Sequence, residues 1–336
     1  MRNLFNLLSK LTFSRFFNLW QVFFSYQISR ITKKVWHLGL PISLSFEPTT
    51  SCNLRCPECP SGLRSFTRKT GMLEENLFEK TIDELAPTLL YLTFYFQGEP
   101  YLNPKFLEMV AYASQKKIFT ATSTNAHYLS DENARQTVIS GLDKLIISLD
   151  GTTQETYQAY RVGGSLEKVI AGAKNIVKWK KKLKSKTPYL IFQFLVVKPN
   201  QHQIANVYDL AKEIGIDEVQ LKTAQIYDFE NGSDLIPTLE KYSRYRKNTA
   251  GNYEIKNVML NHCWKMWHSC VITWNGTVVP CCFDKDASHQ LGNLETNTFR
   301  EVWQGRSYHK FRAALLKSRK TIDICKNCTE GLLLQD

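Results

Sequence analysis

From residue 42 onward, short β-rich runs alternate with longer amphipathic stretches, and this alternation limits the folds open to the chain. Strands connected through helices run parallel, with right-handed crossovers. We therefore predict an α/β sheet, open or closed into a partial barrel, with functional groups at the carboxyl ends of its strands. The predicted strands are 42–47, 90–96, 119–123, 144–149, 190–197 and 218–223, and the predicted helices are 74–85, 104–116, 131–140, 165–183 and 201–214.

Two of these helices have recognisable start signals. We expect Pro104 at the first helical position of 104–116 and Ser130 as the cap of 131–140. The alternation ends after Thr223. The following segment, 226–256, is polar and contains two turn-like sequences, so we interpret it as a linker or bridging region.

The 336 residues include nine cysteines, and three of them form one loop after the first predicted strand. An odd cysteine count without a secretory cleavage site indicates a reducing compartment, where clustered thiols bind metal or do redox chemistry. The loop Cys52-x3-Cys56-x2-Cys59 can supply three thiolates to one iron–sulfur cluster and leave one iron open. A zinc site made by Cys56, Cys59 and two distant ligands is the alternative.

This loop resembles the signature of the radical S-adenosylmethionine (SAM) superfamily, in which it follows the first strand of a partial barrel. The resemblance spans about 42–223 and implies a partial (β/α)6 TIM-like barrel. It also implies a [4Fe–4S] cluster on Cys52, Cys56 and Cys59 whose open iron binds SAM.

Further residues extend the resemblance to the SAM-binding groups. Gly98 and Glu99 follow the second strand and are similar to the family motif that holds the SAM amino group. The segment after the fourth strand is similar to the one whose serine and arginine contact the SAM carboxylate or ribose; the residues concerned are Ser148, Asp150 and Arg161. Glu58 departs from the family pattern, which often has an aromatic residue there, so the adenine contacts must come from elsewhere.

A second cysteine-rich region begins at about residue 257 and resembles the SPASM or twitch extension of radical SAM enzymes. A β-hairpin over 271–281 is expected, with its turn at Asn275-Gly276. The resemblance implies one auxiliary [4Fe–4S] cluster, because the chain ends eight residues after Cys328. Its implied ligands are Cys263, Cys281, Cys325 and Cys328.

Two cysteines of this region are left over. Cys270 and Cys282 are either buried small apolar residues or substitute ligands. A zinc ribbon is the alternative for the region as a whole, because paired cysteine elements also suit tetrahedral zinc.

Charge is unevenly distributed along the chain, whose 43 basic and 31 acidic residues give a net charge of +12. Residues 1–46 contain no acid and are rich in aromatic residues, but no apolar run reaches the ~18 residues that span a bilayer. This amphipathic extension either lies in an anionic membrane interface or packs on the following domain. The seven lysines of 174–186 are typical of a solvated helix end, and no motif supports nucleic-acid binding.

We therefore divide the chain into an N-terminal extension (1–41), a radical SAM partial barrel (42–225), a bridging region (226–256) and a SPASM or twitch domain (257–336). The resemblance implies an oxidoreductase or modifying enzyme that cleaves SAM reductively to methionine and a 5′-deoxyadenosyl radical, which takes hydrogen from a substrate. An external one-electron reductant such as flavodoxin or ferredoxin is implied as well.

The substrate is a small molecule or a peptide. The basic aromatic N-terminus favours a carbohydrate or lipid-linked metabolite and a cytoplasmic location, peripheral on the membrane face. A peptide- or protein-modifying maturase of the SPASM type is the first alternative. A non-enzymatic, zinc-stabilised nucleic-acid-binding protein is the second.

Overall fold

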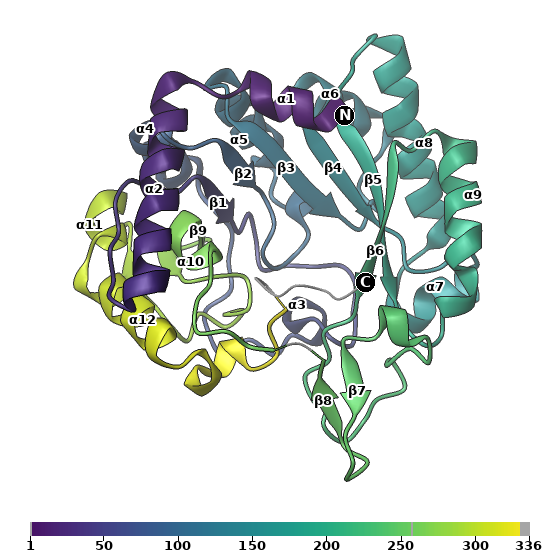
Figure 1. The fold of residues 1–336 in the computed structure, drawn as a ribbon. Coiled ribbons are helices and arrows are strands. Elements are labelled where there is room, and N and C mark those ends of the chain that lie inside the picture. The colour runs from purple at the N-terminus through teal and green to yellow at the C-terminus, as the bar shows by residue number, and fades with distance from the viewer. Residues whose placement is uncertain (1, 257, 330–336) are drawn as a thin grey trace. The chain divides into compact units, whose positions relative to one another are not determined.

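The computed structural model describes residues 2–256 and 258–329 and has an α/β fold (Figure 1). Among these residues the chain forms two compact units. The first contains 2–51, 66–121 and 258–329, and the second contains 52–65 and 122–256. All six predicted strands are present, with ends within a few residues of the predicted ones.

The sheet of the first unit combines strands from both ends of the chain. Its order is β11-β10-β9-β1-β2-β3, in which β1, β2, β3 and β9 are parallel. The hairpin of β9 and β10 was predicted from its Asn-Gly turn, but its pairing beside β1 was not. The strands are β1 (Ser43–Phe46), β2 (Tyr91–Thr93), β3 (Phe119–Thr124, which continues into the second unit), β9 (Ser269–Ile272), β10 (Thr277–Val279) and β11 (Gly292–Asn293).

Helices of the first unit pack on this sheet through an aromatic core. The rings of Phe46, Phe78, Phe94 and Phe106 follow one another at centroid distances of 5.1 to 5.6 Å. The helices are α1 (Arg2–Ser9), α2 (Phe13–Thr32), α4 (Glu75–Leu85), α5 (Phe106–Gln115), α10 (Lys265–His268), α11 (Phe299–Trp303) and α12 (Arg306–Lys317), with 3-10 turns at Pro100–Leu102, Arg319–Thr321 and Asp323–Cys325. Within the described residues, no helix combines the length and the apolarity needed to cross a bilayer.

The prediction for the start of α5 was wrong. The helix begins at Phe106, so Pro104 precedes it. Asn103 explains the shift, because its amide donates to the carbonyls of Pro48 and Leu73 while its side-chain oxygen accepts from the backbone of Lys105. These long-range bonds hold the chain in a turn where local sequence favours a helix.

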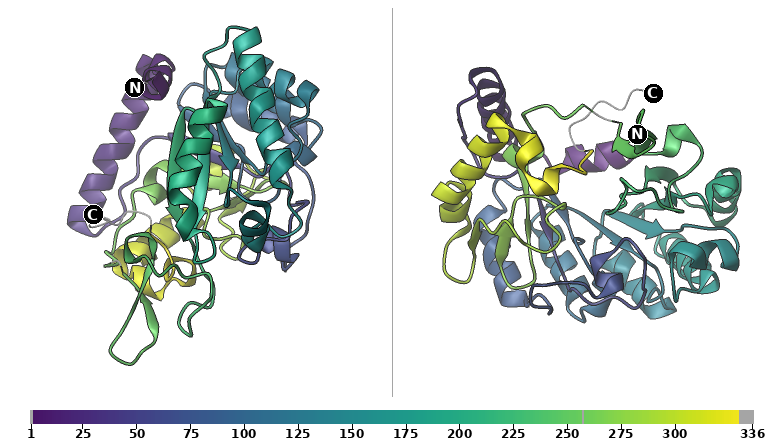
Figure 2. Two further views of the ribbon diagram at one scale, coloured as in Figure 1. Left: turned by 90° about the vertical axis from the view of Figure 1, so that its right-hand side faces the viewer. Right: turned by 90° about the horizontal axis from the view of Figure 1, so that it is seen from below.

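The second unit has three parallel strands in the order β4-β5-β6 with helices between them (Figure 2). Ser130 caps α6 as predicted, since its hydroxyl accepts from the Asn133 amide. The strands are β4 (Lys144–Ser148), β5 (Tyr189–Val196) and β6 (Glu218–Thr223); the helices are α3 (Pro60–Leu63), α6 (Asp131–Ile139), α7 (Gln154–Tyr160), α8 (Leu166–Lys182) and α9 (Ile204–Ile214), the last preceded by the 3-10 turn Gln201–Gln203.

Residues 226–256 are more than a linker. They contain the 3-10 turn Glu240–Tyr242 and an antiparallel pair, β7 (Tyr245–Lys247) and β8 (Tyr253–Ile255). Ile226, Ile236 and Tyr245 are buried, and the Tyr245 hydroxyl bonds both backbone groups of Ile226. The buried residues are spaced too irregularly for a strand or helix pattern to reveal them.

The lysine run lies on the last turns of α8 and just beyond it. Three of its members pair with carboxylates: Lys174 with Glu213, Lys178 with Asp131 and Lys180 with Asp217. This arrangement agrees with a solvated helix end.

Candidate functional site

The three-cysteine loop of the second unit is held in place by backbone contacts. The amide of Arg55 donates to the carbonyl of Val162 at 2.9 Å, which ties the loop to the segment after α7. The loop then turns into α3, where a Cβ at Gly62 would lie 2.6 Å from the backbone nitrogen of Cys56. Glycine is therefore required for the helix to approach this closely. Cys56 is buried, and Cys52 and Cys59 are partly exposed.

Arg161 links this loop to the end of β4. Its Nη1 lies 3.8 Å from Sγ of Cys56, and its Nε donates to the buried carboxylate of Asp150. Burial raises the pKa of the Cys56 thiol and Arg161 opposes that shift. Burial likewise disfavours the charged form of Arg161, but Asp150 and Cys56, together with the neighbouring tyrosines, outweigh it and raise the guanidinium pKa. The predicted residues Asp150, Arg161 and Cys56 are thus brought together, and Ser148 is the last residue of β4, two positions before Asp150.

An apolar layer surrounds the cysteine loop within the same unit. Cys56 packs in a cluster with Leu54, Tyr160, Val197 and residues of 226–256, and Cys52 and Cys59 lie against that cluster. A low-dielectric wall of this kind strengthens electrostatic interactions and limits the access of water. The region predicted as a linker therefore covers the candidate cluster site.

Sequence reasoning left several contacts of this loop out of the site. Asn125, after β3, points its amide at Sγ of Cys52 (3.9 Å) and at the side chain of Asn53 (2.8 Å). The carboxylate of Glu58 accepts from the backbone amide of Tyr227 at 2.9 Å. Glu58 thus fixes the start of the 226–256 segment beside the loop, a long-range role that no local pattern reveals.

Gly98 and Glu99 lie in the first unit, after β2. Gly98 has φ of +73°, and a Cβ there would lie 2.2 Å from the carbonyl oxygen of Thr49. The Glu99 amide donates to the carbonyl of Ser51 at 2.8 Å, and the residue is buried. Gly98 therefore allows the segments that follow β1 and β2 to meet and fixes the position of Glu99.

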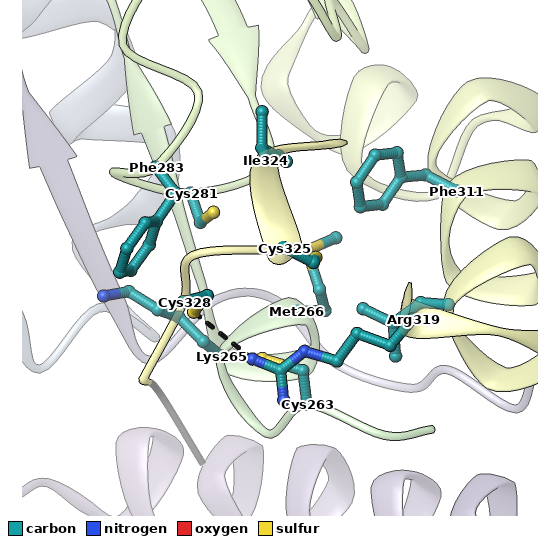
Figure 3. A pocket seen from close by; sticks show the side chains of 11 residues that line it. Cys263, Lys265, Met266, Cys281, Phe283, Phe311, Arg319, Ile324, Cys325 and Cys328 are labelled. Atoms are coloured by element: carbon teal, nitrogen blue, oxygen red, sulfur yellow. Dashed lines mark hydrogen bonds between the residues drawn. The ribbon is translucent and has the colours of Figure 1, made fainter. Parts of the chain in front are cut away.

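Four cysteines line one pocket in the first unit (Figure 3). They come from three segments: the chain before α10, the chain after β10 and the C-terminal segment around the last 3-10 turn. Met266, Phe283, Phe311, Leu315 and Ile324 complete an apolar lining. The four are the predicted auxiliary ligands, Cys263, Cys281, Cys325 and Cys328.

Two basic side chains reach the sulfur atoms of this region. Arg319 is buried and donates from Nη2 to Sγ of Cys328 at 3.3 Å, the bond drawn in Figure 3. The Nζ of Lys265 lies 3.4 Å from Sγ of Cys282. Burial raises the pKa of the Cys325 thiol, and Arg319 opposes it. Positive charge is thus built into a pocket whose donors are anionic when they bind metal.

The two surplus cysteines differ in environment. Cys270 on β9 is fully buried, and burial raises the pKa of its thiol to about 12. That agrees with a small apolar residue of the core. Cys282 is partly exposed next to Cys281 and contacts Lys265.

The donors of the two sites suit iron–sulfur clusters. Across 2–256 and 258–329, no three His, Cys, Asp or Glu side chains converge on a point that could hold a metal ion. Four thiols line one pocket, and cysteine thiolates are the ligands that iron–sulfur clusters use. An α/β fold with a three-thiol loop and a four-thiol pocket fits the class of iron–sulfur proteins.

Comparison with protein families agrees with this class. Residues 46–192 match the model of the radical SAM superfamily, and residues 263–329 match the SPASM model, an iron–sulfur cluster-binding domain. The chain therefore belongs to the radical SAM superfamily and has a C-terminal SPASM domain. It is an enzyme, with SAM and [4Fe–4S] clusters as its cofactors.

Individual relatives act on different kinds of molecule. The chain is 24% identical over 80% of its length to the tungsten-containing aldehyde ferredoxin oxidoreductase cofactor-modifying protein of Pyrococcus furiosus, covering 82% of that protein. It is 23% identical over 82% of its length to the PqqA peptide cyclase of Rhodopseudomonas palustris, covering 76% of it.

Among solved structures, the chain resembles Streptococcus suis SuiB bound to S-adenosylmethionine. The TM-score is 0.64 at 14% identity, over 90% of this chain and 75% of SuiB. SuiB has also been solved bound to its precursor peptide SuiA. At this identity the similarity establishes the fold.

The expected fold class, cofactors and enzymatic nature are thus confirmed, and the reading as a non-enzymatic nucleic-acid-binding protein is wrong. The roles of individual residues, and the boundaries of the four predicted segments, stay predictions.

Proposed function

We propose that this enzyme modifies a peptide or protein, as a maturase of the SPASM type. The observation that carries the proposal is the similarity to PqqA peptide cyclase, which extends over 82% of this chain and so reaches into both family regions. The fold shared with SuiB, a protein solved with a bound precursor peptide, supports the same substrate class.

In this proposal the three-cysteine loop holds the SAM-binding cluster. Cys52, Cys56 and Cys59 are its ligands, and the bound cluster supplies the electron that cleaves SAM. The guanidinium of Arg161, next to Cys56 and Asp150, carries the positive charge that a SAM carboxylate would meet. The buried carboxylate of Glu99 suits the SAM ammonium group, and Ser148 at the end of β4 is a further polar contact.

The four-thiol pocket holds an auxiliary [4Fe–4S] cluster in the same proposal. Arg319 donates to Cys328, so its positive charge favours the more negative, reduced form of that cluster. A cluster whose reduced form is favoured would be suited to accept an electron from the substrate during an oxidation. An external one-electron donor, such as flavodoxin or ferredoxin, would reduce the SAM-binding cluster.

Protease treatment of the substrate source tests the peptide proposal. Reconstituted enzyme is incubated anaerobically with SAM, reductant and cell extract, and 5′-deoxyadenosine is measured above the level without extract. We expect this stimulation to disappear when the extract is digested with a protease that is then inactivated. Stimulation that survives digestion would contradict a peptide or protein substrate.

A carbohydrate or lipid-linked metabolite is the second candidate substrate. The observation that favours it is the exposed aromatic surface of α2, which suits contact with a membrane. In this alternative the enzyme works at the cytoplasmic face of the membrane. Extracting the lipids from the cell extract, rather than digesting its proteins, then abolishes the stimulation of 5′-deoxyadenosine release. The cytoplasmic location agrees with the nine free cysteines.

A further inference from the structure

Helix α2 packs against its unit with the polar side of its surface. Six of its residues are buried, and four of them are polar: Arg15, Asn18, Ser25 and Ser29. An ordinary surface helix does the reverse, burying an apolar stripe and exposing its polar face. Burial of apolar surface therefore does not explain which side of α2 faces the unit.

Hydrogen bonds to the backbone hold the polar side in place. The guanidinium of Arg15 donates to the carbonyls of Ala86 and Lys116, each at 2.9 Å. Asn18 exchanges two bonds of 2.8 Å with the backbone of Leu40. Since each of these buried groups has specific backbone partners, rotating the helix to bury its apolar side would leave them unsatisfied.

The opposite side of α2 is aromatic and exposed. Phe13 is 85% exposed, and Phe16, Phe17 and Trp20 are each at least 50% exposed. Phe23, Phe24, Ile28 and Ile31 extend the surface along the helix, and α1 adds Leu4, Phe5 and Leu8. Neighbouring rings touch one another, as at Trp20 and Phe24 with centroids 4.6 Å apart. A patch of this kind on a folded protein marks an interaction surface.

The charges that flank this surface are all positive. Arg2 precedes it in α1, while Arg30, Lys33 and Lys34 follow at the end of α2, and all four are exposed. No acidic residue occurs in 1–46. Arg15 does not contribute to this exposed charge, since it is buried and bonded to carbonyls.

We propose that the apolar side of α1 and α2 is a docking surface for an anionic lipid bilayer, with the helix axis parallel to the membrane. Aromatic side chains enter the interface while the flanking cations meet lipid phosphates. A second copy of the chain fits less well: a symmetric contact would bring like charges together without an acid in either segment to pair with them. This contact does not depend on which substrate the enzyme modifies.

Vesicle sedimentation with the full-length holoenzyme tests the docking surface. We expect binding to vesicles of phosphatidylcholine and phosphatidylglycerol, weaker binding to phosphatidylcholine alone, and a decrease with salt. The variant Phe17→Gln/Trp20→Gln/Phe24→Gln should bind about 100-fold more weakly. A matched control removes exposed apolar side chains elsewhere, as Ile139→Gln/Tyr208→Gln/Leu239→Gln, and should bind like the wild type.

Two further readouts separate this inference from its competitors. Circular dichroism of the triple α2 variant should match the wild type, and its SAM cleavage in solution should persist, so loss of binding would not reflect loss of the enzyme. Equal vesicle binding by the wild type and the triple variant would overturn the proposal. A wild-type dimer that the triple variant converts to a monomer, without vesicle binding, would also overturn it and identify a self-association surface.

Discussion

Arg161 places its Nη1 3.8 Å from Sγ of Cys56 while its Nε is bonded to Asp150. Asp150 is itself fixed, because its other carboxylate oxygen accepts from the Leu195 amide on β5. Strand β5 therefore orients Asp150, Asp150 orients Arg161, and Arg161 brings positive charge to a buried thiol. Burial raises the pKa of that thiol, and Arg161 offsets part of the rise.

Replacing Arg161 should weaken SAM binding without emptying the cluster site. We expect Arg161→Gln to bind SAM about 10- to 100-fold more weakly, because one charge-assisted contact is lost. Arg161→Lys keeps the charge and should recover part of the affinity. Calorimetric SAM titration and iron analysis check this; iron loss with unchanged SAM affinity in the remaining holoenzyme would contradict the assigned role.

Gly98→Ala should lower the free energy of unfolding by more than the cost of placing alanine at the positive φ of this position. The left-handed φ costs about 1 kcal/mol for alanine, and the collision with the Thr49 carbonyl adds to it. Gly163→Ala is the matched control, since Gly163 has φ of +81° with nothing within 4 Å of an added Cβ. Denaturant unfolding should give the larger loss for Gly98; equal losses would refute the close approach.

Arg319→Gln should lower the reduction potential of the auxiliary cluster. The neutral side chain no longer favours the reduced state, and a shift on the order of 50 mV corresponds to about 1 kcal/mol for one electron. Redox titration followed by electron paramagnetic resonance measures it. Arg319→Lys should shift the potential less. If both variants keep the wild-type potential, Arg319 has only a packing role.

His37 should make stability depend on mildly acidic pH. Burial, with a contribution from Arg312, lowers its pKa from 6.5 to about 3 in the folded protein. The unfolded chain therefore takes up a proton first, so the contribution of His37 is complete above pH 6.5 and declines toward pH 3, by at most about 1.4 kcal/mol per pH unit.

His37→Asn should reduce this slope. Unfolding midpoints of the variant and the wild type, measured between about pH 5 and 7, isolate the histidine from the carboxylates that titrate nearby. The same slope in both proteins would contradict a neutral imidazole at His37 in the folded protein.

The sequence predicted the parts of the fold that depend on local pattern. The six strands followed from their composition and from the helices between them, and the hairpin before Cys281 from its Asn275-Gly276 turn. The four auxiliary cysteines were proposed from spacing and resemblance, and the structure brings them to one pocket.

What the sequence could not predict depends on contacts between distant residues. Pro104 fails to start α5 because Asn103 bonds to carbonyls far away in the chain. The segment 226–256 looks like a linker, yet its buried Ile226 and Tyr245 pack with the cysteine loop. Arg15 belongs to the basic N-terminal segment of the sequence, but its side chain is buried and bonded to carbonyls of three separate backbone segments. Composition does not encode such partners.

Anaerobic SAM cleavage by the reconstituted enzyme tests the central claim most directly. With reductant, the wild type should release 5′-deoxyadenosine and contain about eight iron atoms per chain, four for each [4Fe–4S] cluster. Cys56→Ala should release no 5′-deoxyadenosine and keep about four iron atoms, those of the auxiliary cluster. Release of 5′-deoxyadenosine by Cys56→Ala at the wild-type rate, or its absence from an iron-replete wild type, would contradict the account.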